Sequence, residues 1–112
     1  MPVQRWSESI WMLALSREPE LTEDLDNLDA ALRKQSRTPD VVVDLSGVPS
    51  VTSSTIAKLL RLRKRLADES AELVLTSPVD RVWTVFITAG LDKVFRFRED
   101  TATALADLQL PR

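Results

Sequence analysis

The sequence contains no cysteine and no histidine. This absence excludes disulfides, zinc sites of the usual thiolate and imidazole kind, and thiol nucleophiles, and it removes the commonest general base. Enzymes built from serine, lysine and carboxylates exist, so the absence lowers the expectation of catalysis without excluding it. We expect a protein that is not an enzyme, with no catalytic residues, metal site or cofactor.

Long apolar runs and an excess of basic residues are also missing. No stretch approaches the roughly 20 apolar residues that span a bilayer, and the run from Ile10 to Leu15 is too short for a signal peptide. The chain has 15 Lys and Arg against 17 Asp and Glu, a net charge of -2, so it lacks the basic field of a nucleic-acid-binding protein. These features predict a cytoplasmic protein that neither inserts into a membrane nor binds nucleic acid.

What is present is the composition of an ordinary globular domain, with 44% hydrophobic and 29% charged residues. A length of 112 residues predicts one domain over residues 1–112. The predicted elements are a hairpin over 3–7 and 10–15, a helix over 21–37, a strand over 41–45, a helix to about 69, a strand over 73–75, a helix ending at 90, a strand over 94–97 and a helix over 101–108. Helical crossovers of this length place neighbouring strands parallel, which predicts an α/β fold with a mixed, mostly parallel sheet flanked by helices.

Residue patterns predict how the first and third helices begin, end and pack. Thr22 is the expected cap of the first helix and Ser77 that of the third, while Gly90 suits the left-handed residue that ends a helix. Trp83 and Phe86 fall on an apolar face and are expected in the core. A four, three, four spacing on one face is shared by Leu21, Leu25, Leu28 and Leu32.

The second helix carries an apolar face and a basic stripe. The stripe is formed by Lys58, Arg61 and Arg65, and a solvated surface is its ordinary role. Docking of an acidic partner surface is the alternative. The predicted core face, opposite the stripe, consists of Ile56, Leu59, Leu60, Leu66 and Ala67.

Two segments carry a family resemblance. Residues 41–65 form a hydrophobic strand that ends in Asp-Leu, a short turn, and Thr52-Ser53-Ser54-Thr55 opening a leucine-rich helix. This arrangement resembles the signature of the STAS family, whose pattern at these four positions is Asp-Ser-Ser-Gly. The segment from Ala89 to Phe95 is similar to the family's Thr-Gly-Leu segment. The resemblance implies the fold of the bacterial anti-sigma-factor antagonists.

The resemblance also implies a function and a site. Family members bind an anti-sigma factor that acts as a serine kinase, and the second serine of the motif, Ser54 here, is phosphorylated. Ser53 and Thr52 stay open as alternative phosphorylation sites, because the family's Asp and Gly are missing. The implied partner-binding residues are Thr52, Ser53, Ser54, Thr55, Lys58 and Arg61. The alternative functions are a STAS subunit of an ABC-type lipid transport complex, whose relatives carry a Thr near this motif, and a stressosome-like scaffold.

The same residues also have simpler structural roles open to them. Ser53 and Ser54 lie at a helix start, where capping is the ordinary role of serine. A nucleophilic pair of Ser54 with Lys58 is disfavoured, because the spacing differs from Ser-x-x-Lys and no oxyanion-hole motif is visible. Asp44 is expected to stabilise the turn after its strand.

The amino-terminal hairpin contains two tryptophans, Trp6 and Trp11. We expect one of them to be exposed and available for self-association as a weak homodimer.

Overall fold

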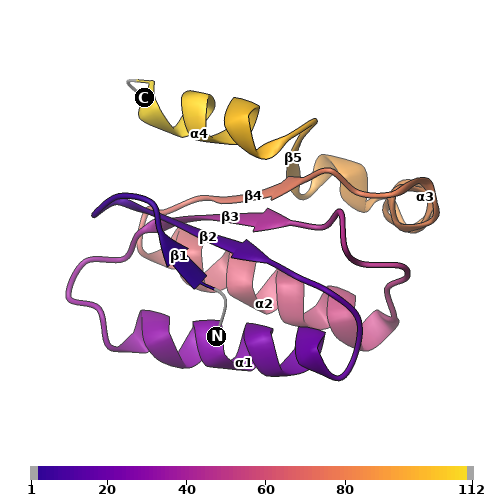
Figure 1. The fold of residues 1–112 in the computed structure, drawn as a ribbon, viewed down its shortest axis with the longest axis horizontal. Coiled ribbons are helices and arrows are strands. Elements are labelled where there is room, and N and C mark those ends of the chain that lie inside the picture. Colours follow the sequence, from indigo (N-terminus) through magenta and orange to yellow (C-terminus); the bar gives the residue numbers. More distant parts are fainter. Residues whose placement is uncertain (1–2, 111–112) are drawn as a thin grey trace.

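Five strands form one sheet, and helices cover both of its faces (Figure 1). The computed structural model describes residues 3–110. The elements are β1 (Val3–Arg5), β2 (Ile10–Ala14), α1 (Glu20–Arg33), β3 (Asp40–Asp44), α2 (Ser53–Asp68), β4 (Leu73–Thr76), α3 (Asp80–Thr88), η1 (Leu91–Lys93), β5 (Arg96–Arg98) and α4 (Thr101–Gln109). Helices α1 and α2 lie side by side on one face, and α4 covers the other (Figure 1).

The strands lie in the sheet in the order in which they occur in the chain. β1 pairs with β2 antiparallel, and the remaining pairs are parallel. The register places Val43 between Leu13 of β2 and Leu75 of β4, and Leu75 lies opposite Phe97 of β5. The predicted mixed sheet with an amino-terminal edge hairpin is confirmed.

Strand β3 is buried on both faces of the sheet. Val41 and Val43 pack into the larger core beneath α1 and α2, whereas Val42 packs into the smaller core beneath α4. Alternate residues of a strand point to opposite faces, so a strand covered on both sides needs a continuous apolar run. The β-branched run of the sequence is therefore the central strand, as predicted.

Helix α1 buries its four leucines as predicted. Thr22, however, is not the cap, because the helix begins two residues earlier, at Glu20. The Glu18 carboxylate instead accepts hydrogen bonds from the Thr22 amide (2.9 Å) and hydroxyl (2.7 Å). A carboxylate placed before the first turn satisfies an otherwise unpaired amide and complements the helix dipole.

Helix α2 buries a face that differs in part from the predicted one. Leu59 and Leu66 are buried as expected, but Ala67 is exposed, whereas Thr55 and Leu62 are buried. The face turned inward is set by contact with both the sheet and α1, and it passes through Thr55, Leu59, Leu62 and Leu66. Ile56 and Leu60 are half-buried at its margin.

Helix α3 begins at Asp80, and Ser77 is not its cap, contrary to the prediction from sequence. Ser77 has a left-handed backbone, with a φ of 55°, and its hydroxyl donates to the Glu99 carbonyl (3.1 Å) at the end of β5. It joins two strand ends and does not cap the helix. Gly90 has a φ of 73° after the carboxyl end of α3, as predicted.

Aromatic side chains fill the space between α3 and the edge of the sheet. Phe86 is fully buried and meets Phe95 and Phe97 edge to face, with centroid separations of 5.5 and 5.1 Å. Trp83 is half-buried and contacts Phe97 at 4.9 Å. These contacts place the predicted aromatic face of α3 against β5.

Ion pairs hold helix α4 against β5, and a carboxylate caps its amino end. Asp107 of α4 forms ion pairs with Arg96 and Arg98 of β5. At the amino end, the Asp100 carboxylate accepts the Thr103 amide hydrogen bond at 2.7 Å. The backbone and hydroxyl hydrogen bonds of Thr103 lower the pKa of the Asp100 carboxyl.

The larger core should respond strongly to truncation of its central side chains. We expect Leu59→Ala and Phe86→Ala each to lower the free energy of unfolding by about 2 to 5 kcal/mol, because each leaves a cavity in a packed core. Arg63→Ala, an exposed change on α2, should cost under about 0.5 kcal/mol. Chemical denaturation measures all three, and equal midpoints would contradict this assignment of the α2 faces.

The Asp100 cap predicts an acid-sensitive contribution to stability. Because its pKa is lowered on folding, the carboxylate stabilises the fold above the unfolded-state pKa, and the contribution is lost as the pH falls through the lower, folded-state value. The difference in denaturation midpoint between the wild type and Asp100→Ala should therefore be largest near neutral pH and should shrink in acid. The corresponding difference for Thr52→Ala, an uncharged cap, should not follow the same titration.

Candidate partner-binding site at the start of α2

The start of α2 is presented by a loop that follows β3 at the carboxyl end of the parallel strands. The Asp44 carboxylate accepts the Ser46 amide hydrogen bond at 2.8 Å, which confirms its predicted turn-stabilising role. Val48 is fully buried and anchors the middle of the loop. A Cβ on Gly47 would lie 2.9 Å from the Leu15 carbonyl oxygen, so the loop packs directly on the segment after β2. The residues that follow are held in a fixed position.

Thr52 is the residue that caps α2. Its backbone is extended, and its hydroxyl accepts the Thr55 amide hydrogen bond at 3.2 Å. The Thr55 hydroxyl lies 3.2 Å from that of Thr52 and is buried. The expectation that Ser53 or Ser54 caps the helix is therefore wrong, since the residue before them performs this role.

Ser53 and Ser54 occupy the first turn of α2 and are exposed. Their hydroxyls form no hydrogen bond with any residue of the described chain. The exposed loop residues Pro49 and Ser50 lie just before them, and we call residues 49, 50 and 52–54 the α2 edge. No acidic side chain lies in the first turn of α2, so the positive end of its dipole is not complemented there. The α2 edge can therefore accept a negative charge.

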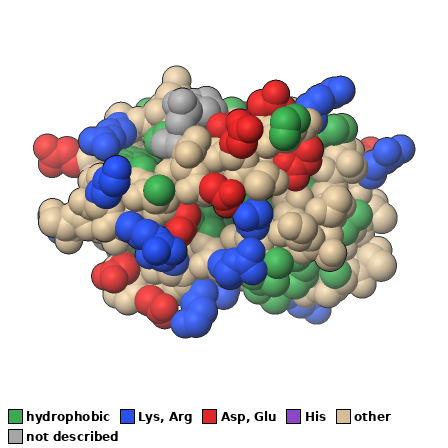
Figure 2. All heavy atoms as spheres, turned by 90° about the horizontal axis from the view of Figure 1, so that it is seen from below, with side chains coloured by type: hydrophobic (Ala, Val, Ile, Leu, Met, Phe, Trp, Pro, Cys, Tyr) green, Lys and Arg blue, Asp and Glu red, His purple; other side chains and the backbone are tan. Residues whose placement is uncertain are grey.

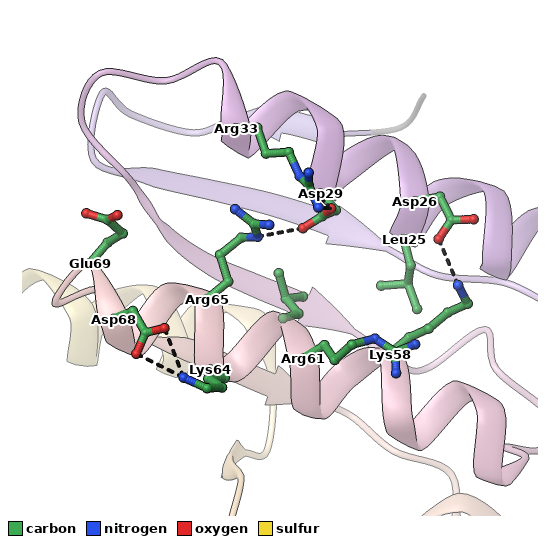
Figure 3. Close-up of a pocket in the computed structure, with 11 residues that line it drawn as sticks. Leu25, Asp26, Asp29, Arg33, Lys58, Arg61, Lys64, Arg65, Asp68 and Glu69 are labelled. Atoms are coloured by element: carbon green, nitrogen blue, oxygen red, sulfur yellow. Dashed lines mark hydrogen bonds and ion pairs between the residues drawn. The ribbon is translucent and has the colours of Figure 1, made fainter.

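The basic stripe does not face away from the core, as the sequence predicted, but turns toward α1. The Lys58 ammonium pairs with Asp26 at 2.8 Å, and the Arg65 guanidinium pairs with Asp29 at 2.6 Å (Figure 3). Both side chains are half-buried, whereas Arg61 is exposed and forms no ion pair with the described residues. The physical reason is the rotation of α2 that buries Leu62, which brings the stripe to the boundary between the helices.

A groove of about 450 Å³ runs between α1 and α2 along this stripe. Leu25 and Leu62 contribute apolar surface to it, and charged side chains from both helices line its sides (Figure 3). Viewed from this side of the molecule, Lys and Arg side chains gather near the middle of the surface, with Asp and Glu side chains among them (Figure 2). We call this feature the α1–α2 groove.

The structure brings together five of the six residues expected at the site. Thr52, Ser53 and Ser54 lie on the α2 edge, and Lys58 and Arg61 follow Ser54 at helical spacings of four and seven, on one side of the helix. Thr55 is turned into the core and is not accessible to a partner. The α1 acids of the groove, Asp26 and Asp29, were missed, because their pairing depends on how α1 packs against α2.

Of the two tryptophans in the amino-terminal hairpin, Trp6 is 46% exposed and Trp11 only 3%. The Trp11 ring is packed in the larger core, and the Arg5 guanidinium lies 4.9 Å from its centroid. Trp6 is thus the residue that an interface could use, as self-association would require.

A protein-family model described as "Mlab, STAS domain" matches residues 14–99 of the chain. The match spans β3, the α2 edge and the α1–α2 groove. No curated protein sequence matches the chain.

Solved structures share the fold at low sequence identity. A candidate anti-sigma factor antagonist from Thermotoga maritima superposes with a TM-score of 0.83 at 16% identity, covering 97% of this chain and 94% of that one. An anti-sigma-factor antagonist (STAS) domain protein from Planctomyces limnophilus gives 0.79 at 22% identity, covering 96% and 97%. Moorella thermoacetica RsbS with a serine-to-glutamate substitution gives 0.80 at 16% identity, covering 96% and 93%. At these identities the likeness concerns the fold.

The division of roles at the start of α2 can be tested by three alanine variants. Thr52→Ala should lower the free energy of unfolding by about 1 kcal/mol, because the Thr55 amide loses its acceptor. Ser53→Ala and Ser54→Ala should each change it by less than about 0.5 kcal/mol, as substitutions at exposed, unpaired positions do. Thr52→Ser, which keeps the accepting oxygen, is the matched control. A larger loss for Ser54→Ala than for Thr52→Ala in urea denaturation would contradict the assignment.

Proposed function

The chain belongs to the Mlab, STAS domain family, and we propose that, like the solved structures described as anti-sigma-factor antagonists that share its fold, it is an anti-sigma-factor antagonist. In this role it binds an anti-sigma factor or a related serine kinase through the α2 edge, and so frees a sigma factor. Phosphorylation of Ser54 ends the binding. The observation that carries the proposal is the exposed Ser54 hydroxyl, which has no structural task because Thr52 caps the helix.

The surroundings of Ser54 support a binding role over catalysis. A serine nucleophile needs a base within hydrogen-bond reach, and the Ser54 hydroxyl has no such partner among the described residues. Lys58, the nearest candidate in sequence, is engaged by Asp26 at 2.8 Å in the α1–α2 groove. Proteins of this fold family are typically regulatory modules without enzymatic activity.

Among residues 3–110, none of the helices has the length and apolar character that a membrane span requires.

A phosphate at Ser54 would change binding without disturbing the fold. It adds roughly 1.5 to 2 negative charges at neutral pH. The positive end of the α2 dipole, which lacks an acid in its first turn, tolerates this charge in the free protein. Lys58, four residues further along the helix, lies on the same side and adds a cation. A partner surface fitted to the neutral hydroxyl would instead bury an unpaired charge, which is strongly unfavourable.

The second candidate function is that of a constitutive STAS subunit in an ABC-type lipid transport complex. Thr52 favours it, because the family resemblance associates a threonine near the motif with such subunits, and Thr52 is exposed on the α2 edge. In this case the same edge binds another protein, and Ser54 needs no phosphorylation. Phosphate transfer distinguishes the two functions.

Substitutions at Ser54 test the switch. Ser54→Asp should fold normally, since an acid is favourable near a helix amino terminus, but its binding to the anti-sigma factor should weaken by about 2 kcal/mol or more. Ser54→Ala should keep binding, and it should gain no phosphate when incubated with the kinase and ATP. Calorimetry measures the affinity, and intact-mass spectrometry measures the phosphate.

The matched control for charge is Ser36→Asp, an exposed serine before β3, at the opposite end of that strand from the α2 edge. It should bind like the wild type. Phosphate on Ser53 or Thr52 would move the switch along the same edge. If Ser54→Asp binds normally and no phosphate is transferred, the switch is wrong and the constitutive subunit becomes the better explanation.

A further inference from the structure

The α1–α2 groove contains one guanidinium group, that of Arg61, that has no counterion within the described part of the chain. We propose that this groove binds an acidic helical segment of the partner protein, whose carboxylates, spaced four residues apart, pair with Arg61 and Arg65. The inference rests on the proposed function as a protein-binding module, and it names the chemistry of the bound segment. It adds a second contact surface beside the α2 edge.

The charges that line the groove are not balanced. Asp29 is shared by two guanidinium groups, from Arg65 at 2.6 Å and from Arg33 at 3.0 Å, while Arg61 forms no ion pair with the described residues. Three arginines thus have one carboxylate between them. The two lysines of the lining are each balanced, Lys58 by Asp26 and Lys64 by Asp68.

The remaining acidic residue that lines the groove, Glu69, does not neutralise the excess positive charge at Arg61. Glu69 caps the carboxyl end of α2, about two helical turns from Arg61. The middle of the groove therefore carries uncompensated positive charge, and a carboxylate placed there would gain an attraction that no group of the described chain supplies.

The spacing of the cations matches that of acidic residues on a helix. Arg61 and Arg65 are four residues apart on one helix, a rise of about 6 Å. Acidic residues four apart on an incoming helix repeat at the same interval, so two carboxylates can meet the two guanidiniums in register. Arginine also suits such pairing, because its planar group can donate two hydrogen bonds to one carboxylate.

The shape of the groove favours a peptide over a free anion. Its cations are spread along the helices instead of converging on one point, as a compact phosphate would require (Figure 3). Leu25 and Leu62 offer apolar surface for the aliphatic part of bound side chains. An elongated, charged and partly apolar ligand fits both features.

The groove also bears on the proposed switch. Ser54, Lys58, Arg61 and Arg65 fall on one side of α2 at spacings of four, three and four, so a phosphate on Ser54 would lie at the amino end of the same stripe. It would repel an acidic segment bound there and attract Lys58. For a partner that binds both surfaces, the phosphate would thus weaken the contact at the α2 edge and the contact in the α1–α2 groove.

The experiment uses the full chain and a defined probe, a helical peptide of roughly 15 residues with glutamates four apart, and the same peptide with glutamines as the control. Titrations followed by NMR should shift amide signals in α1 and α2 along the groove.

Arg61→Gln should weaken binding about twofold to fivefold, as the loss of an exposed ion pair does. Arg63→Gln is the matched control, since it removes the same charge two residues away, on an exposed part of α2 outside the groove lining. It should bind like the wild type.

Several outcomes would overturn the inference. Equal weakening by Arg61→Gln and Arg63→Gln would mean that only net charge matters, and equal binding of the glutamine peptide would exclude recognition of carboxylates. Inorganic phosphate that displaces the peptide and reproduces its shifts would identify a simple anion site. The result is independent of Ser54, so a failure here leaves the test of the α2 edge intact.

Discussion

The burial of β3 on both faces is the constraint from which the rest of the structure follows. A strand with no exposed face needs covering layers on either side, and here α1 and α2 supply one and α4 the other. Parallel pairing on both sides of β3 places the carboxyl ends of β2, β3 and β4 at one edge of the sheet, where the crossover segments begin. The loop that begins α2 thus lies among the ends of three neighbouring strands, and a rigid base of this kind can present a short exposed edge accurately to a partner.

Charge is distributed unequally over this scaffold. Where β5 meets α4, the two arginines share two acids: Arg96 pairs with Glu72 and Asp107, and Arg98 pairs with Asp107, which fastens β5 to α4. Between α1 and α2 the same residue types leave the Arg61 guanidinium without an ion-pair partner among residues 3–110. The same kinds of side chain therefore give a closed structural contact in one place and an open, charged surface in another. The difference lies in the ratio of carboxylates to arginines, and not in the number of charges.

Most of the architecture could be predicted from sequence. The predictions that were wrong share a cause. The continuous run over 41–45 and the leucine spacing of α1 depend on local periodicity, so they identified elements and faces correctly. The expected caps Thr22 and Ser77 were wrong because distant or unexpected groups, the Glu18 carboxylate and the Glu99 carbonyl, determine what those side chains do. The rotation of α2, and with it the orientation of the basic stripe, depends on how α2 packs against α1. The periodicity of α2 alone carries no information about that packing.

The separation of Thr52 from Ser54 affects how such a protein can evolve. Where one hydroxyl both caps a helix and is modified, substituting it alters regulation and folding together. Under the proposed switch these two roles belong to different residues, because Thr52 caps α2 and Ser54 is exposed. A lineage can therefore lose or regain the modifiable hydroxyl by a single substitution without passing through a poorly folded intermediate. Regulation at this position is open to drift and selection, while the scaffold stays the same.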